Sequence, residues 1–169
     1  SLSFAYQMAR RGYTVTVYEQ HDIPGGMLRT AIPDYRLPRD VLDAEMDRLF
    51  NLGITLATNV DVGTTMTLDE LRDRHALLFL GLGAQLPRRL GVPGEDGPGV
   101  VSGIDYLQAR KMEPVSLKGR QVLVIGGGNT AIDAARSARR DGADVTVVYR
   151  RSESEMPASK EEIEAAKAE

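Results

Sequence analysis

The sequence contains no cysteine. This absence excludes disulfides, thiolate zinc sites, cysteine-ligated iron–sulfur clusters and a redox-active Cys-x-x-Cys pair within the chain. The two histidines, His21 and His75, are too few for a multi-histidine metal site, and we assign each a solvated or structural role. We therefore expect no metal site and no catalytic side chain of the histidine or cysteine type.

The sequence also lacks a strong net charge and a long hydrophobic run. Its 21 basic and 24 acidic side chains give a net charge of -3, so no overall field favours nucleic acid or an anionic membrane. The longest apolar run, at 76–80, is far shorter than the ~20 residues of a membrane span, and the first residues lack a signal-peptide pattern. We expect a soluble, cytoplasmic protein with neither nucleic acid nor membrane as a partner.

The most informative part of the chain is the stretch 121–151. Its pattern predicts a buried strand, a glycine-rich turn, a helix with a small-residue face, and a second strand after a glycine stop. These elements fall at 122–125, 126–128, about 129–140 and 144–149. A glycine turn between a strand and a helix is the context in which dinucleotide-binding motifs occur.

The glycine turn reads G-x-G-x-x-A. Gly126 permits the tight turn, Gly128 lets a pyrophosphate approach the backbone, and Ala131 takes the place of the third glycine. The positive end of the helix would then face the phosphates. We predict dinucleotide binding, with a purely structural β-α-β unit as the alternative.

The end of the second strand indicates which dinucleotide binds. An NAD site has Asp or Glu there, whereas this strand ends in Arg150 and Arg151. Guanidinium groups pair bidentately with phosphate and keep their charge, so we predict NADP(H). The alternative is an exposed strand end whose arginines are neutralised by Glu153 and Glu155.

The first residues look like the second half of another dinucleotide unit. A helix stops at Gly12 and is followed by a strand at 14–18 that closes with Glu19, where such an acid hydrogen-bonds ribose hydroxyls. A solvated strand end is the alternative for Glu19. The strand and phosphate loop of this unit would lie before Ser1, so we expect the chain to be a fragment.

The segment between the two units predicts further α/β structure. Its prolines and paired glycines exclude regular structure at 24–38 and leave a backbone able to lie against a flat ligand. Helices are expected at 39–52, 68–75 (opened by a capping box at Thr67 and Glu70) and 104–112, with strands at 54–58 and 76–80. The fold class is therefore α/β, with two partial dinucleotide-binding units and parallel sheets. The Pro/Gly-rich stretch 86–99 indicates a crossover between domains, with a long surface loop as the alternative, and the expected domains are 1–87 and 88–169.

Read in order, the motifs are G-G-M-L-R…I-P-x-Y-R-L-P, G-x-P-G-E-D-x-P-G-V and V-I-G-G-G-N-T-A…V-Y-R-R-S…M-P-A-S. This series resembles the flavoprotein family of the glutamate synthase small (β) subunit. The flavin module of dihydropyrimidine dehydrogenase and the large subunit of ferredoxin-dependent NADPH transhydrogenase are similar. The resemblance implies Rossmann-like, three-layer FAD- and NADPH-binding domains that pass electrons from NADPH through FAD to iron–sulfur centres outside this chain or to a partner subunit.

The resemblance also implies site residues for both cofactors. For FAD it implies a ribose-binding acid, a flavin-contacting turn, an arginine that contacts the FAD, a backbone contact at the adenine end and a loop beside the flavin. These are, in the same order, Glu19, the turn Gly25, Gly26 and Met27, then Arg36, Val62 and Gly83. For NADPH it implies a phosphate turn and a basic pair at the 2′-phosphate. These are Gly127, Gly128, Asn129 and Thr130 with Gly126 before them, and Arg150 with Arg151.

The function that follows is NADPH-dependent flavin oxidoreduction, most similar to the glutamate synthase β subunit. Flavin chemistry needs little beyond the placing of two cofactors, so no catalytic side chain is expected. The partner would be an electron-accepting subunit or domain. We expect this chain alone to be inactive, to hold FAD weakly and to self-associate. The alternatives are a non-catalytic nucleotide-binding module, or a flavin module of the dihydropyrimidine dehydrogenase or transhydrogenase type.

Overall fold

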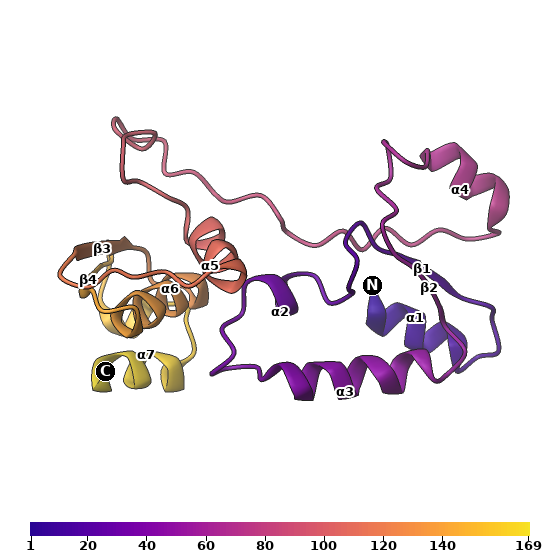
Figure 1. Cartoon of the computed structure of the whole chain (residues 1–169), viewed down its shortest axis with the longest axis horizontal. Helices are drawn as coiled ribbons and strands as arrows, with labels where there is room; N and C mark the ends of the chain where they lie inside the picture. The colour runs from indigo at the N-terminus through magenta and orange to yellow at the C-terminus, as the bar shows by residue number, and fades with distance from the viewer. The chain divides into compact units, whose positions relative to one another are not determined.

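The computed structural model describes residues 1–169, which form two compact units (Figure 1). Unit 1 consists of Ser1–Arg29 and Leu37–Gln85, and unit 2 consists of Thr30–Arg36 and Leu86–Glu169. Thr30–Arg36, which we call the docked segment, therefore belongs with the second unit although unit 1 flanks it on both sides in the sequence.

Unit 1 is built around a two-stranded parallel sheet. Strand β1 (Thr16–Tyr18) pairs with β2 (Thr55–Ala57), and Val17 lies opposite Leu56. The helices of this region are α1 (Leu2–Ala9), α2 (Met27–Thr30), α3 (Arg39–Phe50) and α4 (Leu68–Arg74). The predicted order of helix, strand, helix, strand and helix is present, with strands two residues shorter than the sequence suggests.

Helices α3 and α4 begin where their sequences predict, and α3 ends at Phe50, two residues before the predicted end. Helix α3 buries Leu42 and Met46, which are four residues apart and so share one face. Helix α4 opens with a capping box: the Thr67 hydroxyl accepts from the Glu70 N–H (3.2 Å), and the Glu70 carboxylate accepts from the Thr67 N–H (2.8 Å). Two of the backbone donors that a helix start leaves unsatisfied are thereby paired.

The prediction of a central parallel strand at 76–80 is wrong. This run has no strand conformation, and Leu77 and Leu80 are 64% and 63% exposed. The sheet of unit 1 consists of β1 and β2, and the run forms a ladder of hydrogen bonds with neither. Its one aromatic side chain, Phe79, stacks instead on Phe4 of α1, with 4.3 Å between the ring centroids.

The prediction that 24–38 lacks regular structure also needs correction. Gly25 and Gly26 have φ angles of +129° and +50° and turn the chain directly into the single helical turn α2. Helix α2 contains neither glycine nor proline, so its four residues can adopt helical geometry between the two interrupted stretches.

Unit 2 contains the β-α-β arrangement predicted around the glycine turn. Strands β3 (Gln121–Ile125) and β4 (Asp144–Val148) pair in parallel over five residues, with Ile125 opposite Val148. The connecting helix α6 runs over Asn129–Arg140, the predicted range. The remaining elements are α5 (Gly103–Met112), the 3-10 turn η1 (Glu153–Glu155) and α7 (Lys160–Ala168). The predicted α/β fold with parallel sheets is confirmed.

Helix α6 is the centre of unit 2. Seven consecutive residues, Ile132 to Ala138, are buried, so the helix is covered all round rather than on one face. Helices α5 and α7 and both strands pack against it, as the orange and yellow part of Figure 1 shows. Its alanines allow this close packing, but the buried set also includes Asp133, Arg136 and Ser137. No helix in either unit has the length and apolar character needed to cross a lipid bilayer.

Candidate functional site

The glycine turn between β3 and α6 presents an uncapped helix start. Gly126 has a φ of +144°, and a side chain there would meet the Cβ of Ala131 at 3.1 Å. Its N–H donates to the Val148 carbonyl (2.9 Å), which fixes the turn to the end of β4. Gly128 is the N-cap of α6, and no side chain accepts a hydrogen bond from the first turn. The donors at this helix start are therefore available to an anion.

The next two glycines of the turn differ in their surroundings. A Cβ on Gly127 would lie 2.8 Å from Cδ2 of Tyr149 and 3.0 Å from Cγ of Met156, so this position is closed by the protein itself. A Cβ on Gly128 would meet only Cγ of Pro157, at 4.0 Å. Gly127 thus serves internal packing, whereas the face of Gly128 is open to a ligand.

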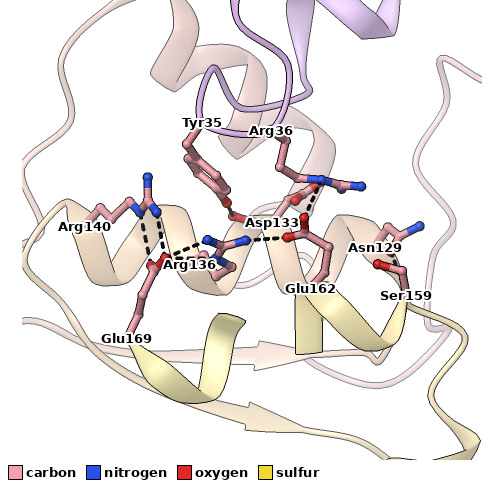
Figure 2. Close-up of polar contacts among 9 residues, drawn as sticks. All are labelled: Tyr35, Arg36, Asn129, Asp133, Arg136, Arg140, Ser159, Glu162 and Glu169. Atoms are coloured by element: carbon pink, nitrogen blue, oxygen red, sulfur yellow. Dashed lines mark hydrogen bonds and ion pairs between the residues drawn. The ribbon is translucent and has the colours of Figure 1, made fainter. Parts of the chain in front are cut away.

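The stretch after η1 is fastened to this turn by two hydrogen bonds. The Ala158 N–H donates to the Gly127 carbonyl (3.1 Å), and the Ser159 N–H donates to Oδ1 of Asn129 (3.0 Å; Figure 2). Ser159 is also the N-cap of α7. Asn129 therefore links the start of α6 to the start of α7, a role that the sequence motif did not reveal.

The two arginines after β4 are both exposed, and they differ in their contacts. The guanidinium carbon of Arg151 lies 5.6 Å from the ring centroid of Tyr149, and Nη1 lies 4.0 Å from the Glu155 carboxylate. Arg150 has no hydrogen bond or ion pair. One exposed guanidinium is therefore free and the other is only loosely held.

The glutamates that could neutralise these arginines are engaged elsewhere. Glu155 accepts from the hydroxyl (2.7 Å) and the N–H (3.1 Å) of Ser152, and these hydrogen bonds hold the pKa of its carboxyl below its ordinary value. Glu153 pairs with Lys167 at 3.0 Å. The alternative of a strand end neutralised by local ion pairs is therefore weak for Arg151 and has no support for Arg150.

The predicted FAD residues of unit 1 occupy turns and strand ends. Glu19 follows β1, and its carboxylate accepts from the His21 N–H (3.0 Å), while its carbonyl accepts from the Val60 N–H (2.9 Å). The second bond brings the stretch that contains Val62 next to Glu19. Gly83 has a φ of +73° in an exposed extended stretch.

Arg36, the last predicted FAD residue, belongs to the docked segment. Its Nη1 lies 2.7 Å from Oδ2 of Asp133 on α6, and its Nε lies 3.2 Å from Oε1 of Glu162 on α7 (Figure 2). Sequence reasoning missed both acids. The available signal was an acidic residue within the small-residue helix of a dinucleotide motif, where a charge needs a partner.

An aromatic and ionic cluster lies beside Arg36. The guanidinium carbons of Arg140 and Arg136 lie 3.8 Å and 4.5 Å from the ring centroid of Tyr35. Arg136 is paired with Glu162 and, at 2.7 Å, with Glu169. Burial raises the pKa of the Tyr35 hydroxyl. In Figure 2 the ring of Tyr35 lies against α6, so the docked segment is fastened by ring and guanidinium contacts together.

Comparison with known proteins agrees with this architecture. Residues 1–169 match the family model described as pyridine nucleotide-disulphide oxidoreductase, and the chain belongs to this family. The M. tuberculosis protein FprA, solved in complex with NADPH, has a TM-score of 0.81 at 22% identity over 99% of this chain and 44% of its own. Lactococcus lactis thioredoxin reductase has a TM-score of 0.60 at 21% identity over 99% of this chain and 58% of its own. Because both identities are below 25%, these two structures support the fold of this chain and not its function.

Relatives in sequence indicate which type of oxidoreductase within the family this chain is most similar to. The β subunit of the NADP(+)-dependent formate dehydrogenase of Moorella thermoacetica is 45% identical over 99% of this chain and 24% of its own length. The β subunit of an NADPH-Fe(3+) oxidoreductase of Geobacter sulfurreducens is 39% identical over 98% of this chain and 25% of its own. The small chain of Escherichia coli glutamate synthase [NADPH] is 34% identical over 99% of this chain and 38% of its own length. These matches confirm the prediction that the chain is of the glutamate synthase β-subunit type. The chain spans about a quarter to two-fifths of the length of these relatives.

Proposed function

We propose that this chain is the cofactor-binding part of an oxidoreductase in which NADPH reduces FAD and the electrons leave to another centre or subunit. The observation that carries the proposal is the uncapped start of α6 at Gly128 in the same β-α-β unit as the free arginine Arg150. The names of the relatives support it, since they include NADP(+)- and NADPH-dependent enzymes.

The residues of the turn fit NADPH. The N–H groups at Gly128, Asn129 and Thr130 would bind the pyrophosphate, and the missing side chain of Gly128 leaves space for it. Arg150 and Arg151 would bind the 2′-phosphate, because both guanidinium groups are exposed and only Arg151 has an ion pair, at 4.0 Å from Glu155. When bound, the nicotinamide supplies a hydride; the chain's part is to hold and orient it.

The FAD assignment depends on the residues of unit 1. The Glu19 carboxylate uses one oxygen for the His21 N–H and keeps the other for a ribose hydroxyl. Gly25 and Gly26 form a left-handed turn without side chains, which suits a flat ring system lying on the backbone, with Met27, Val62 and Gly83 as further contacts. We assign FAD binding to residues 1–87 and NADPH binding to 88–169, with the docked segment packed on the NADPH-binding unit.

The final electron acceptor is a separate part of the proposal. By name, the relatives belong to different systems, a formate dehydrogenase, an NADPH-Fe(3+) oxidoreductase and a glutamate synthase, and several are β subunits or small chains. We propose a partner subunit or an iron–sulfur domain as the acceptor, and a glutamate synthase-like system as the first candidate. The alternative, a nucleotide-binding module without turnover, gives no reason for the glycine turn at Gly25 and Gly26.

The NADP assignment can be tested by removing the arginines. Arg150→Ala combined with Arg151→Ala should weaken NADPH binding by on the order of 2 to 4 kcal/mol and leave NADH binding nearly unchanged, measured by titration calorimetry. Arg120→Ala, at an exposed arginine before β3, is the matched control and should change neither. Equal weakening of both dinucleotides would show that the pair supports the fold and not the 2′-phosphate.

A further inference from the structure

The ring of Tyr149 contacts both the glycine turn and the basic end of β4. Tyr149 is the first residue after β4 and is partly buried. A Cβ on Gly127 would lie 2.8 Å from Cδ2 and 2.9 Å from Cε2 of Tyr149, so the ring fills the place that a side chain on Gly127 would take. The guanidinium carbon of Arg151 lies 5.6 Å from the centroid of the same ring. One side chain therefore touches both the phosphate turn and an arginine proposed to bind the 2′-phosphate.

The hydroxyl of Tyr149 fixes the direction of the ring. It donates to the Glu155 carbonyl of η1 (3.2 Å). The turn η1 is itself held in place, because the hydroxyl (2.7 Å) and the N–H (3.1 Å) of Ser152 donate to the Glu155 carboxylate. Met156, directly after η1, packs against the core formed by α6 and α7 and also lies beside Gly127. The ring is therefore restrained along its edge by Gly127 and at its hydroxyl by η1.

A restrained ring can hold Arg151 without neutralising it. A guanidinium within about 6 Å of a ring centroid is attracted to the ring, and this contact leaves its N–H donors free for a phosphate. The carboxylate of Glu155 does not take up those donors, because its Oε2 accepts from Ser152 and its Oε1 lies 4.0 Å from Nη1 of Arg151. Arg150 lies over no aromatic ring. An arginine whose rotamers are already restricted loses less conformational entropy when it binds an anion.

We propose that Tyr149 is a positioning residue that holds Arg151 for the 2′-phosphate and so contributes to the choice of NADPH over NADH. The inference rests on the proposed function, in which the glycine turn and the two arginines bind NADPH. Tyr149 acts through Arg151 on NADPH alone, and through Gly127 on both dinucleotides. A purely structural tyrosine would act only in the second way, and it would weaken both dinucleotides by the same factor.

The test measures the ratio of the NADH dissociation constant to the NADPH dissociation constant for the whole chain, by titration calorimetry. Tyr149→Leu removes the ring and should lower this ratio about fivefold. Tyr149→Phe keeps the ring beside Gly127 and loses only the hydrogen bond to Glu155. It should lower the ratio about twofold, because the ring that holds Arg151 is then less restrained.

The two neighbouring arginines separate the route through Arg151 from a general effect. Tyr149→Leu combined with Arg151→Ala should lower the ratio no further than Arg151→Ala alone, whereas combined with Arg150→Ala it should keep its full effect. Tyr106→Phe is the matched control. The Tyr106 hydroxyl donates to Asp141 (2.7 Å), the C-cap of α6, at the far end of the helix from the glycine turn. Its loss should lower the stability of unit 2 and leave the ratio unchanged.

A ratio that is alike in the wild type, Tyr149→Leu and Tyr149→Phe would overturn the positioning role, even where both dinucleotides bind more weakly. An equal change of the ratio in Tyr106→Phe would overturn it as well. If Tyr149→Leu does not fold, the ratio for Tyr149→Phe decides. A wild-type chain that binds NADPH no more tightly than NADH would overturn the proposed function itself, and the two failures are therefore distinguishable.

Discussion

Replacing Gly128 by alanine should separate cofactor binding from folding. The added methyl would meet only Pro157, at 4.0 Å, and the backbone of Gly128 (φ -89°, ψ 171°) is one that alanine adopts. Alanine is a poorer N-cap residue than glycine, and we expect this difference to lower the stability by about 1 kcal/mol or less. The same methyl would occupy the space through which a pyrophosphate approaches the start of α6.

The neighbouring substitution gives the opposite expectation. Alanine at Gly127 would put its methyl 2.8 Å from the ring of Tyr149 and 3.0 Å from Met156, closer than carbon atoms approach without displacement. Overpacking of this kind costs about 1 to 3 kcal/mol. Gly127→Ala is therefore expected to destabilise unit 2 first and to affect the cofactor through the fold.

Two measurements distinguish the variants. Urea unfolding should show a midpoint that is lowered less for Gly128→Ala than for Gly127→Ala. NADPH titration should show at least about a tenfold loss of affinity, or 1.4 kcal/mol, for Gly128→Ala. Wild-type NADPH affinity in Gly128→Ala would refute the placing of the cofactor at this turn. Equal stability of the two variants would refute the packing account.

Two further predictions concern stability. Thr67→Ala should lower the stability of unit 1 by about 1 kcal/mol in chemical denaturation, because the Glu70 N–H loses its acceptor. Thr14→Ala, at an exposed threonine whose side chain makes no hydrogen bond, should not. Arg140, with Arg136, lowers the pKa of Glu169 from 4.5 to about 2, so this contact stabilises unit 2 above pH 4.5 and is lost as the pH falls towards 2. Glu169→Gln should flatten the dependence of the urea midpoint on pH in that window, and an unchanged slope would contradict the assignment.

The β-α-β unit could be predicted from the sequence because its determinants are local. The apolar strand before Gly126, the helix 129–140 and the Gly142 stop lie in one continuous stretch, and the helix has the predicted bounds. A parallel pair joined by one helix is the arrangement such a stretch favours. Two details differ. Strand β4 ends at Val148 instead of Tyr149, whose ring packs on Gly127. Strand β3 begins at Gln121 and is not buried as predicted, since Leu123 and Ile125 are 60% and 57% exposed.

The strand predicted at 76–80 is not formed, because strand formation there depends on contacts with distant parts of the chain. An apolar run without polar alternation is compatible with a buried parallel strand, but only a neighbouring strand can supply its hydrogen bonds. Composition does not show whether that neighbour is present. The exposure of Leu77 and Leu80 is the consequence of its absence from the two-stranded sheet.

The contacts of Arg36 could not be predicted for a different reason. The sequence places Arg36 among the flavin motifs, whereas its partners Asp133 and Glu162 lie 97 and 126 positions later, and no periodicity relates them. The burial of Arg36, Asp133 and Glu162 can be explained only when the three side chains are considered as one group of ion pairs. Asp133 would be costly inside a helix that is buried all round, and the docked segment brings the one cation bonded to it.

The buried polar residues of α6 therefore explain its surroundings. A helix with only alanines at its centre would pack against β3 and β4 and leave its outer side to water or to any apolar neighbour. Asp133 and Arg136 instead need oppositely charged partners. Arg36 of the docked segment pairs with Asp133, and acidic side chains of α7 and the residue after it pair with Arg136. Charge pairing thus selects which segment covers the helix, at a place where apolar packing alone would not discriminate.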